Sequence, residues 1–378
     1  MKGPRALNRC HSILDLRERA KRRLPSPIFD FLDGGAETET TMRRNTAAFD
    51  EENLIPRCLI DVASLNMSTQ ILGQNIEWPV FCGPTGTSRL FHPEGELAAA
   101  RAAASAGTLY SLSTGSTYSI EDVAHASNGP KMFQVYVYKD RDITRELIER
   151  SKRSGYSALC LTVDVPVIGK RERDLRSGFG MSPKWSLNSL VSFAGHPAWV
   201  AGRIRQGALS MANFADRPER SWSIEHLDAS ITWKDVREII DQWGGPFALK
   251  GVMSVEDARH AADVGVTAVI VSNHGGRQLD GAAAPIEVLP EIAGAVGDRM
   301  EVILDGGIRR GVHVLKALAL GAKACSIGRP YLYGLSAGGE AGVAKALDIL
   351  RTELTLAMKL SGCADIRSID KTLIRRCL

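Results

Sequence analysis

From residue 79 onward, the sequence repeats one pattern eight times: a short apolar run that ends in Gly, Pro or a polar residue, usually followed by a segment with helical spacing. The apolar runs are Pro79–Gly86, Leu109–Ser116, Met132–Tyr138, Ala158–Pro166, Phe247–Val252, Ala268–Asn273, Val302–Gly307 and Ala324–Pro330. Helical spacing occurs in Glu94–Ala106, Asp142–Ser154, Trp233–Trp243, Val255–Val264, Ile286–Val296 and Val312–Leu320. Apolar strands that alternate with helices are typical of a parallel sheet. Eight such units predict a closed (β/α)8 barrel, and an open doubly wound sheet is the main alternative.

One segment precedes the repeated pattern and another interrupts it. We expect residues 1–78 to form an N-terminal helical extension that packs on a barrel formed by residues 79–378. Residues 167–232 separate the fourth apolar run from its helix, and a connection of this length is usually functional. We therefore expect this insertion to form a lid or an oligomer contact.

The composition of the insertion adds a further possibility. Half of the six tryptophans lie there, namely Trp185, Trp199 and Trp222. Between Leu175 and Ile224, six charged residues are basic and two are acidic. Because apolar and basic segments adsorb to anionic lipid, peripheral contact of residues 175–224 with a membrane surface is the alternative to a lid.

The overall composition excludes several classes of protein. Lys and Arg exceed Asp and Glu by 47 to 43, so the net charge of +4 argues against a nucleic-acid binder with one broad basic face. The seven cysteines are odd in number and form no C-x-x-C pair, which indicates reduced thiols in a cytoplasmic protein. The sequence contains no apolar run long enough to span a membrane and no secretory signal. The spacing of His and Cys matches no metal site.

Polar residues stand where the predicted strands end, which is where barrel enzymes place their active sites. Packing alone does not call for such a ring of polar groups, so we expect a functional site there. Its members are Thr85, Ser113, Gln134, Tyr136, Thr162, Asp164, Arg171, Lys250, Ser272, His274, Arg277, Asp305 and Arg329.

The segments that follow the last two predicted strands resemble a phosphate-binding site. Asp305–Arg309 reads DGGIR, and Gly328 and Arg329 follow the eighth apolar run. Small residues let backbone N–H groups approach an anion, and the loops after strands seven and eight commonly hold phosphate in barrels. The alternative is that the glycines serve tight turns only.

His274, Arg277 and Lys250 are the residues expected to carry the chemistry. Histidine is suited to proton transfer near neutral pH, and Asp164 could hold its second ring nitrogen. Arg171 and Arg277 could bind a carboxylate through paired N–H donors. Lys250 would stabilise negative charge that develops on a cofactor or substrate, and a Schiff-base lysine is the less favoured interpretation.

Several ordered motifs resemble the family of FMN-dependent L-2-hydroxy-acid dehydrogenases and oxidases, which includes glycolate oxidase, L-lactate dehydrogenase and mandelate dehydrogenase. The most specific motif is Ser272–Asp280, which reads SNHGGRQLD. The others are Asp33–Ala36, His92–Glu96, Phe133–Val137, Leu161–Asp164, Leu249–Gly251 and Leu304–Gly307. Together they extend over nearly the whole chain.

The resemblance implies a bound FMN and assigns roles around it. The flavin would contact Pro84, Thr85, Gly86, Ser113, Gln134, Thr162, Lys250 and Ser272. Its phosphate would lie on Asp305, Gly306, Gly307, Ile308, Arg309, Gly328 and Arg329. His274 would take a proton from the 2-hydroxy acid with Asp164 paired to it, and Tyr136 would bond the substrate oxygen. The family resemblance also suggests a homotetramer.

Three positions bear on substrate and electron acceptor. Phe31 stands where the family usually has a tyrosine that helps to hold the substrate carboxylate. Gly115 stands where glycolate oxidase has tryptophan, which leaves room for a larger 2-substituent. Gly86 is more common in membrane-linked dehydrogenases of the family, whereas oxidases more often have alanine.

The sequence therefore predicts an FMN-dependent dehydrogenase that oxidises a lactate-like or bulkier L-2-hydroxy acid and passes electrons to a quinone or other carrier. The protein is expected in the cytoplasm, with the inner face of the cell membrane as a site of peripheral attachment. The alternatives are an oxidase that produces hydrogen peroxide, and a flavin-binding homologue impaired by Phe31. A barrel of the IMP-dehydrogenase type is disfavoured, because Cys82, Cys160 and Cys325 lie within predicted strands.

Overall fold

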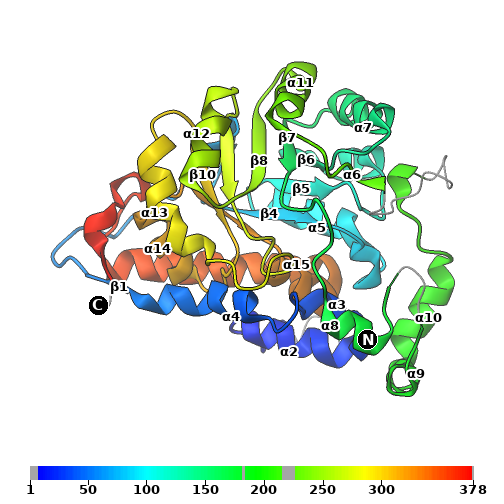
Figure 1. Cartoon of the computed structure of the whole chain (residues 1–378). Helices are drawn as coiled ribbons and strands as arrows, with labels where there is room; N and C mark the ends of the chain where they lie inside the picture. Colours follow the sequence, from blue (N-terminus) through cyan, green and yellow to red (C-terminus); the bar gives the residue numbers. More distant parts are fainter. Residues whose placement is uncertain (1–6, 181–183, 215–225, 377–378) are drawn as a thin grey trace.

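The computed structural model describes residues 7–180, 184–214 and 226–376, and it contains the predicted closed barrel (Figure 1). All eight barrel strands are parallel and follow the order β10-β11-β4-β5-β6-β7-β8-β9 around the ring. They are β4 (Val80–Thr85), β5 (Tyr110–Ser113), β6 (Lys131–Val135), β7 (Ala158–Thr162), β8 (Phe247–Val252), β9 (Ala268–Val271), β10 (Glu301–Asp305) and β11 (Ala324–Ile327). Each predicted apolar run contributes residues to one strand, which confirms the barrel and excludes the open sheet.

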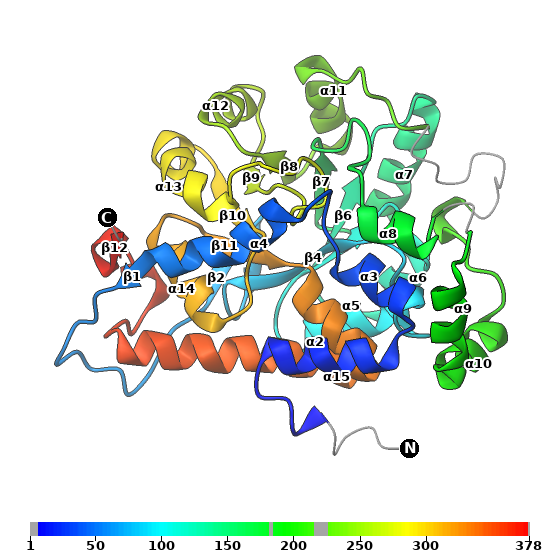
Figure 2. The same cartoon turned by 60° about the horizontal axis from the view of Figure 1, so that its bottom comes forward.

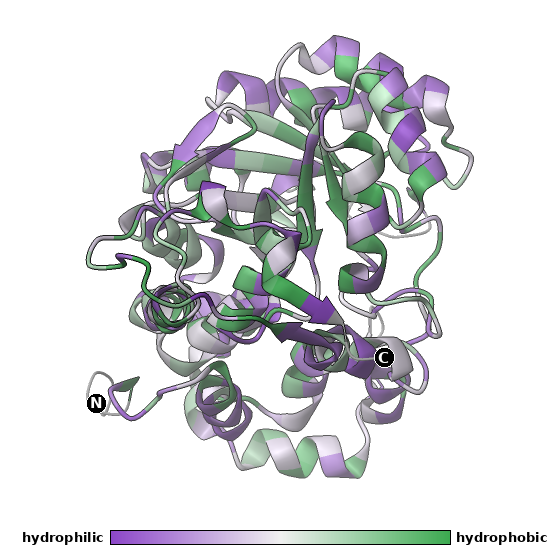
Figure 3. Ribbon diagram, turned by 90° about the vertical axis from the view of Figure 1, so that its left-hand side faces the viewer, coloured by the Kyte–Doolittle hydropathy of each residue, from purple (hydrophilic) through white to green (hydrophobic). Residues whose placement is uncertain are grey.

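The helices that follow the strands cover the outside of the barrel. They are α5 (Gly95–Ser105), α6 (Ile120–Ala126), α7 (Arg141–Arg153), α11 (Trp233–Trp243), α12 (Val255–Asp263), α13 (Pro285–Val296), α14 (Gly311–Ala319) and α15 (Arg329–Leu360). In Figure 3 these helices alternate between hydrophobic and hydrophilic segments along their length, as expected for helices with one buried face. Sequence analysis predicted six of them and missed α6 and α15. The backbone of α15 leaves helical geometry at Gly338 and Gly339.

A short hairpin closes the N-terminal end of the barrel. It consists of β2 (Thr69–Ile71) and β3 (Gln74–Ile76), joined by Leu72 and Gly73, which both have positive φ. Such a two-residue turn matches the twist of the strands that it connects. The hairpin side chains belong to the same buried cluster as interior residues of the barrel strands. The functional residues at the opposite end therefore rest on a packed interior.

The N-terminal segment runs across the barrel as three helices, α2 (Ile13–Arg23), α3 (Ser26–Asp33) and α4 (Thr40–Ala47). Helix α2 begins at a capping box made by Ser12 and Asp15, and it packs against α15 (Figure 2). Farther along, β1 (Glu52–Leu54) pairs antiparallel with β12 (Ile374–Arg376) near the end of the chain. The end of the N-terminal segment is thus joined to the last strand of the chain on one side of the barrel.

The insertion after β7 is helical in the parts that the structure describes. It contains α8 (Glu172–Ser177), α9 (Leu187–Ala194) and α10 (Pro197–Gln206). Helices α9 and α10 project beyond the outline of the barrel in Figures 1 and 2. Trp185 and Trp199 lie in this part, whereas Trp222 lies outside the described residues. Among the described residues, no helix is long and apolar enough to cross a membrane.

Candidate active site

A cavity of about 1310 Å³ opens at the C-terminal ends of the barrel strands. It is larger than the roughly 300–1,000 Å³ that suits one drug-sized ligand, so it has room for a cofactor together with a substrate. Its walls come from the strand ends, from α3 and from the insertion. Among the described residues, no group of three or more His, Cys, Asp or Glu is arranged to hold a metal ion.

His274 lies in this cavity and is paired with a carboxylate, as the sequence predicted. Its Nδ1 atom is 2.9 Å from Oδ1 of Asp164. Asp164 follows β7, which is separated from β9 by β8 in the barrel. Burial alone would raise the pKa of Asp164, but His274 and Lys250 hold that pKa below its ordinary value. The charged carboxylate keeps the second ring nitrogen, Nε2, available for proton transfer in the cavity.

The turn that carries His274 has an unusual backbone. His274, Gly275 and Gly276 all have positive φ, at 57°, 64° and 72°. For histidine this conformation is sparsely populated and persists only when its surroundings impose it. The N–H of His274 donates to Oγ of Ser272 at 3.1 Å, and the N–H of Gly276 donates to Oδ1 of Asn273 at 3.1 Å.

The N-terminal segment also makes hydrogen bonds that hold the turn at residues 274–276 in place. The N–H of Ala36 donates to the carbonyl of Gly276 at 2.8 Å. The side-chain amides of Asn45 and Asn273 exchange two hydrogen bonds, of 2.8 Å and 2.7 Å, and both residues are buried. Sequence analysis did not identify Asn45, because its partner is 228 residues away.

Lys250 is buried at the centre of a polar cluster. Its Nζ atom donates to Oγ of Ser272 at 3.1 Å and lies 3.4 Å from Oδ2 of Asp305. The carboxylate of Asp305 also accepts bonds from the hydroxyls of Ser272 and Ser326, at 2.7 Å and 2.9 Å. Burial alone would lower the pKa of Lys250, but Asp305 and Asp164 raise it above its ordinary value. The side chain therefore presents a fixed positive charge at the cavity wall.

One buried amide has a donor without a partner. Oε1 of Gln134 accepts from Oγ of Ser113 at 3.2 Å and from the N–H of Thr114 at 3.3 Å, whereas its Nε2 is buried and makes no hydrogen bond. An unsatisfied buried donor is costly, so a missing acceptor is expected beside it. The polar edge of a flavin ring supplies such acceptors, which makes this residue fit FMN.

The ends of β4 and β5 approach each other at the cavity wall. A Cβ atom on Gly86 would lie 2.8 Å from the carbonyl oxygen of Gly115, closer than side-chain carbons normally come. Glycine at position 86 is therefore required by this close approach. Nearby, the hydroxyls of Thr85 and Tyr331 are 2.5 Å apart. Pro84 also lines the cavity, and Thr162 is buried at the end of β7.

The predicted phosphate loops both border the cavity. Residues 305–309 and 328–329 are among its lining residues. Arg309 donates from Nη1 to the carbonyl of Ile308. The guanidinium of Arg329 instead donates to the carbonyls of Asp33, Gly34 and Gly275. Arg329 thus ties the N-terminal segment to the His274 turn, and a role for it in phosphate binding stays a prediction.

Arg171 and Arg277 meet around Phe31 at the other end of the cavity. Their guanidinium carbons lie 5.5 Å and 5.3 Å from the centre of the phenyl ring. Arg277 also donates to the carbonyls of Phe31 and Gly34. Burial, Arg171 and Arg329 lower the pKa of Arg277, and the nearby carboxylate of Asp174 opposes this effect. Tyr136 also lines the cavity, and burial raises the pKa of its phenol, so it stays protonated.

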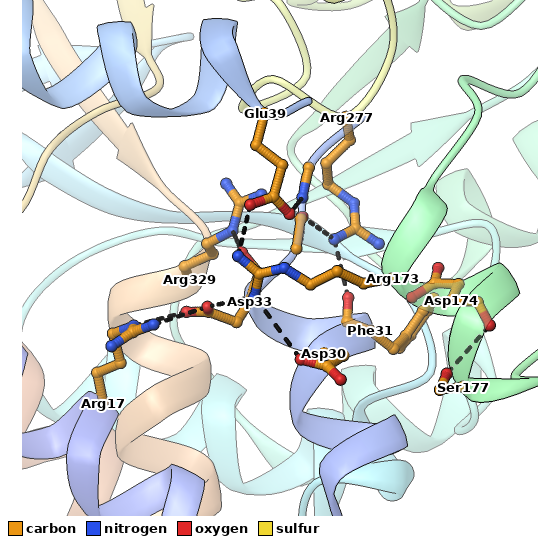
Figure 4. Close-up of polar contacts among 12 residues, drawn as sticks. Arg17, Asp30, Phe31, Asp33, Glu39, Arg173, Asp174, Ser177, Arg277 and Arg329 are labelled. Atoms are coloured by element: carbon orange, nitrogen blue, oxygen red, sulfur yellow. Dashed lines mark hydrogen bonds and ion pairs between the residues drawn. The ribbon is translucent and has the colours of Figure 1, made fainter. Parts of the chain in front are cut away.

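A second buried ion cluster lies just outside the arginine pair (Figure 4). Asp33 accepts from Nε and Nη2 of Arg17, at 2.7 Å and 2.8 Å, from the hydroxyl of Tyr333 at 2.7 Å, and from Nη1 of Arg173 at 3.0 Å. Arg173 also pairs with Glu39. Although burial would raise the pKa of Asp33, these donors hold it far below its ordinary value. The cluster joins α3 to α8, the helix that follows Arg171.

Comparison with known proteins is consistent with this geometry. The profile of the family described as FMN-dependent dehydrogenase matches residues 20–376. The chain is 42% identical to L-lactate oxidase of Nostoc sp. and 43% identical to L-lactate dehydrogenase of Caulobacter vibrioides, with 96% of this chain and 97% of each relative covered. It is also similar to the crystal structure of monotopic membrane protein (S)-mandelate dehydrogenase, with a TM-score of 0.94 and 37% identity over 98% of this chain and 100% of that one.

Proposed function

The chain belongs to the FMN-dependent dehydrogenase family, and from this premise we propose that it oxidises an L-2-hydroxy acid, lactate-like or bulkier, to the 2-oxo acid. Electrons then pass to a quinone or another carrier. The observation that carries the proposal is that His274, which is paired with Asp164, lines the same cavity as Arg171 and Arg277. A base and two guanidinium groups are the side chains that a 2-hydroxy acid requires.

Each residue has a defined part in the proposed reaction. Arg171 and Arg277 bind the substrate carboxylate, and the protonated phenol of Tyr136 donates to the 2-oxygen. Nε2 of His274 removes a proton from the substrate, and Asp164 stabilises the resulting imidazolium. FMN, when bound, would accept the two electrons and the second hydrogen of the substrate. Lys250 stabilises the negative charge that accompanies reduction.

An anaerobic titration of the purified holoprotein tests this function. A panel of L-2-hydroxy acids of increasing side-chain size is added while flavin absorbance is recorded. Bleaching by some members supports the proposal and ranks the side chains that fit near Gly115. If the protein contains flavin and no acid of the panel bleaches that flavin, the proposed function is contradicted.

We propose a dehydrogenase rather than an oxidase. Gly86 favours a dehydrogenase, and the close approach of Gly115 opposes alanine at that position. An oxidase is the second candidate, because the similar proteins include a lactate oxidase as well as a lactate dehydrogenase. Turnover with a quinone analogue, compared with peroxide yield in air, separates the two.

We expect Phe31→Tyr to lower the Michaelis constant for 2-hydroxy acids by about tenfold. The phenyl ring of Phe31 lies against Arg171 and Arg277, so an added hydroxyl would reach the carboxylate that these residues bind. A hydrogen bond to a charged group contributes about 1.5–3 kcal/mol. Phe179→Tyr is the matched control, since its ring packs against Phe31 at 4.7 Å. An unchanged Michaelis constant with both small and large substrates would show that position 31 does not face the substrate.

The insertion supports peripheral attachment to the inner face of the cell membrane. Leu187 and Val191 stand one turn apart on α9, and their side chains are mostly exposed. Lys184, Arg203 and Arg205 lie nearby in sequence, and residues 184–214 contain no Asp or Glu. Apolar side chains next to basic ones suit an anionic lipid surface. The similar mandelate dehydrogenase is described as a monotopic membrane protein.

The double variant L187Q/V191Q is expected to reduce binding to phosphatidylglycerol-containing vesicles by at least about tenfold, because each apolar side chain contributes about 1.5–3 kcal/mol when fully buried. Vesicle sedimentation measures the change. The matched control is L356Q/L360Q, which alters two exposed leucines with the same spacing on α15. Equal binding by both variants contradicts the assignment of this face. We also propose that residues 167–232 form a lid over the cavity. We further propose that the protein is a homotetramer, which sedimentation velocity would measure.

A further inference from the structure

Helix α4 packs against two loops of the active site, although none of its own residues lines the cavity (Figure 2). The loops are the turn at residues 274–276 and the predicted phosphate loop at residues 305–309. A Cβ atom on Gly276 would lie 2.6 Å from backbone atoms of α4. A Cβ atom on Gly307 would lie 1.8 Å from the backbone oxygen of Asn45. The backbone of α4 therefore fits directly against both loops and fixes their relative position.

Both ends of α4 are bonded to the segment that carries His274. In the first turn of the helix, the N–H of Thr41 donates to Oδ1 of Asp280 at 2.8 Å. In the last turn, the buried amide of Asn45 exchanges two hydrogen bonds with the buried amide of Asn273. These anchors lie on either side of the turn in sequence, so α4 braces the whole segment between them.

The amide of Asn45 helps to set the orientation of the Asn273 amide. Nδ2 of Asn273 donates to Oδ1 of Asn45 at 2.7 Å and to the carbonyl of Ala283 at 2.9 Å. Oδ1 of Asn273 accepts from Nδ2 of Asn45 at 2.8 Å and from the N–H of Gly276 at 3.1 Å. A reversed Asn273 amide would place donor against donor at Gly276 and acceptor against acceptor at Ala283. The bonds from Asn45 therefore reinforce the orientation that holds the turn.

We propose that Asn45 is a positioning residue, which keeps the imidazole of His274 in place by acting through Asn273. The inference rests on the proposed function and deepens it by adding a residue that touches neither substrate nor cofactor. His274 has a positive φ, and such a conformation persists only where its surroundings impose it. Because α4 also packs against residues 305–309, the base is held relative to the predicted phosphate loop and not by its own strand alone.

The carboxylate-binding arginine of the same segment is held by different contacts. The guanidinium of Arg277 donates to the carbonyls of Phe31 and Gly34, which belong to α3 and its C-terminal cap. Neither bond involves α4. Loss of the Asn45 amide is therefore expected to slow proton removal by His274 without weakening the grip on the substrate carboxylate.

Asn45→Leu tests the proposal, because leucine has a shape close to that of asparagine and makes no hydrogen bond. The holoprotein is mixed anaerobically with L-lactate, or with the most reactive acid of the panel, over a range of concentrations. We expect the limiting rate of flavin reduction to fall by about tenfold or more, since a misplacement of about 1 Å can cost about 10²-fold. The substrate concentration that gives half of this rate is expected to stay the same.

Hydrogen exchange of backbone amides gives a measurement that needs no turnover. In the oxidised holoprotein, mass spectrometry is expected to show exchange about fivefold faster in residues 272–280 of Asn45→Leu, the effect of losing one hydrogen bond. The dissociation constant of FMN is expected to be unchanged, because the backbone contact of α4 with residues 305–309 remains.

A double-mutant cycle shows whether Asn45 acts through Asn273. If it does, the double variant N45L/N273L reduces its flavin no more slowly than Asn273→Leu alone. Asn66→Leu is the matched control, because the amide of Asn66 also joins distant segments, by a bond of 3.1 Å to Asp365, and does not line the cavity. This control is expected to keep the wild-type limiting rate. Asn45→Ser is a second variant that removes the amide pair with a smaller side chain.

Three outcomes would overturn the inference. The first is an unchanged limiting rate in Asn45→Leu and Asn45→Ser, and the second is a cycle in which the two substitutions act independently. The third is loss of FMN from both variants, which would show that Asn45 supports the whole site and not the base in particular. If no acid bleaches the wild-type flavin, the proposed function fails, whereas exchange of residues 272–280 still tests the brace.

Discussion

Replacing His274 by glutamine is expected to slow reduction of the bound flavin by L-2-hydroxy acids by about 10²–10⁴-fold, the usual contribution of a positioned general base. Glutamine keeps a polar side chain of similar length but cannot take up a proton near neutral pH. The contact of 2.9 Å between Nδ1 of His274 and Oδ1 of Asp164 would be lost. Anaerobic stopped-flow measurement of flavin absorbance gives the rate directly, and flavin content shows that the cavity is intact.

The control for His274→Gln is the same substitution at a histidine outside the cavity. His260 lies on α12 and packs against Trp233 on the outside of the barrel. His260→Gln is expected to leave the rate of flavin reduction unchanged. If His274→Gln reduced the flavin as fast as wild type with every active acid, another group would have to be the base.

The second large effect is expected at Lys250. Lys250→Met removes the positive charge at the cavity wall and leaves the mostly buried Asp305 with two hydroxyl donors and without the lysine cation. Loss of one fixed charge-stabilising group usually costs about 10²–10³-fold in rate. Breaking a buried pair costs about 3–5 kcal/mol of folding stability. We therefore expect a slower reduction, a more negative flavin potential and a lower melting temperature.

A control variant at a buried lysine near the other end of the barrel distinguishes an effect on the flavin from an effect on folding stability. Lys131 begins β6, and its Nζ donates to the carbonyls of Ser127 and Gly129. Lys131→Met is expected to lower the melting temperature without moving the flavin potential. An unchanged potential in Lys250→Met would contradict the role given to Lys250.

The sequence was most informative where the signal is local. The apolar strands, the helix Trp233–Trp243 and the strand-end polar residues follow from periodicity and position in the repeat. The structure places most of these polar residues on the wall of one cavity; Gln134, Thr162, Asp164 and Ser272 are not among its lining residues. Helix α6 escaped prediction because its seven residues are too few for a clear helical period. Helix α15 escaped because glycines at 338 and 339 interrupt its pattern.

The contacts that sequence analysis missed are long-range. Sequence analysis predicts Arg329 at the phosphate because it follows the eighth apolar run, and that role stays a prediction. It did not predict the bonds from this guanidinium to the carbonyls of residues 33 and 34, which are about 300 positions away. The ion pairing of Asp33 was missed for the same reason, although Asp33 belongs to one of the family motifs. Its pairing depends on Arg17 and Arg173, which the fold brings next to it, and no single-sequence pattern reports that proximity.

Because the N-terminal segment holds the His274 turn, the active site can form only after distant parts of the chain have come together. Asp33 and Tyr333 are 300 residues apart, so the first helices emerge from the ribosome long before their partners exist. At roughly 5–20 residues per second, this interval is about 15–60 s. Closing such long-range contacts is also slow in refolding. The working site is thus among the last parts to form, and uptake of flavin should report the end of folding rather than its beginning.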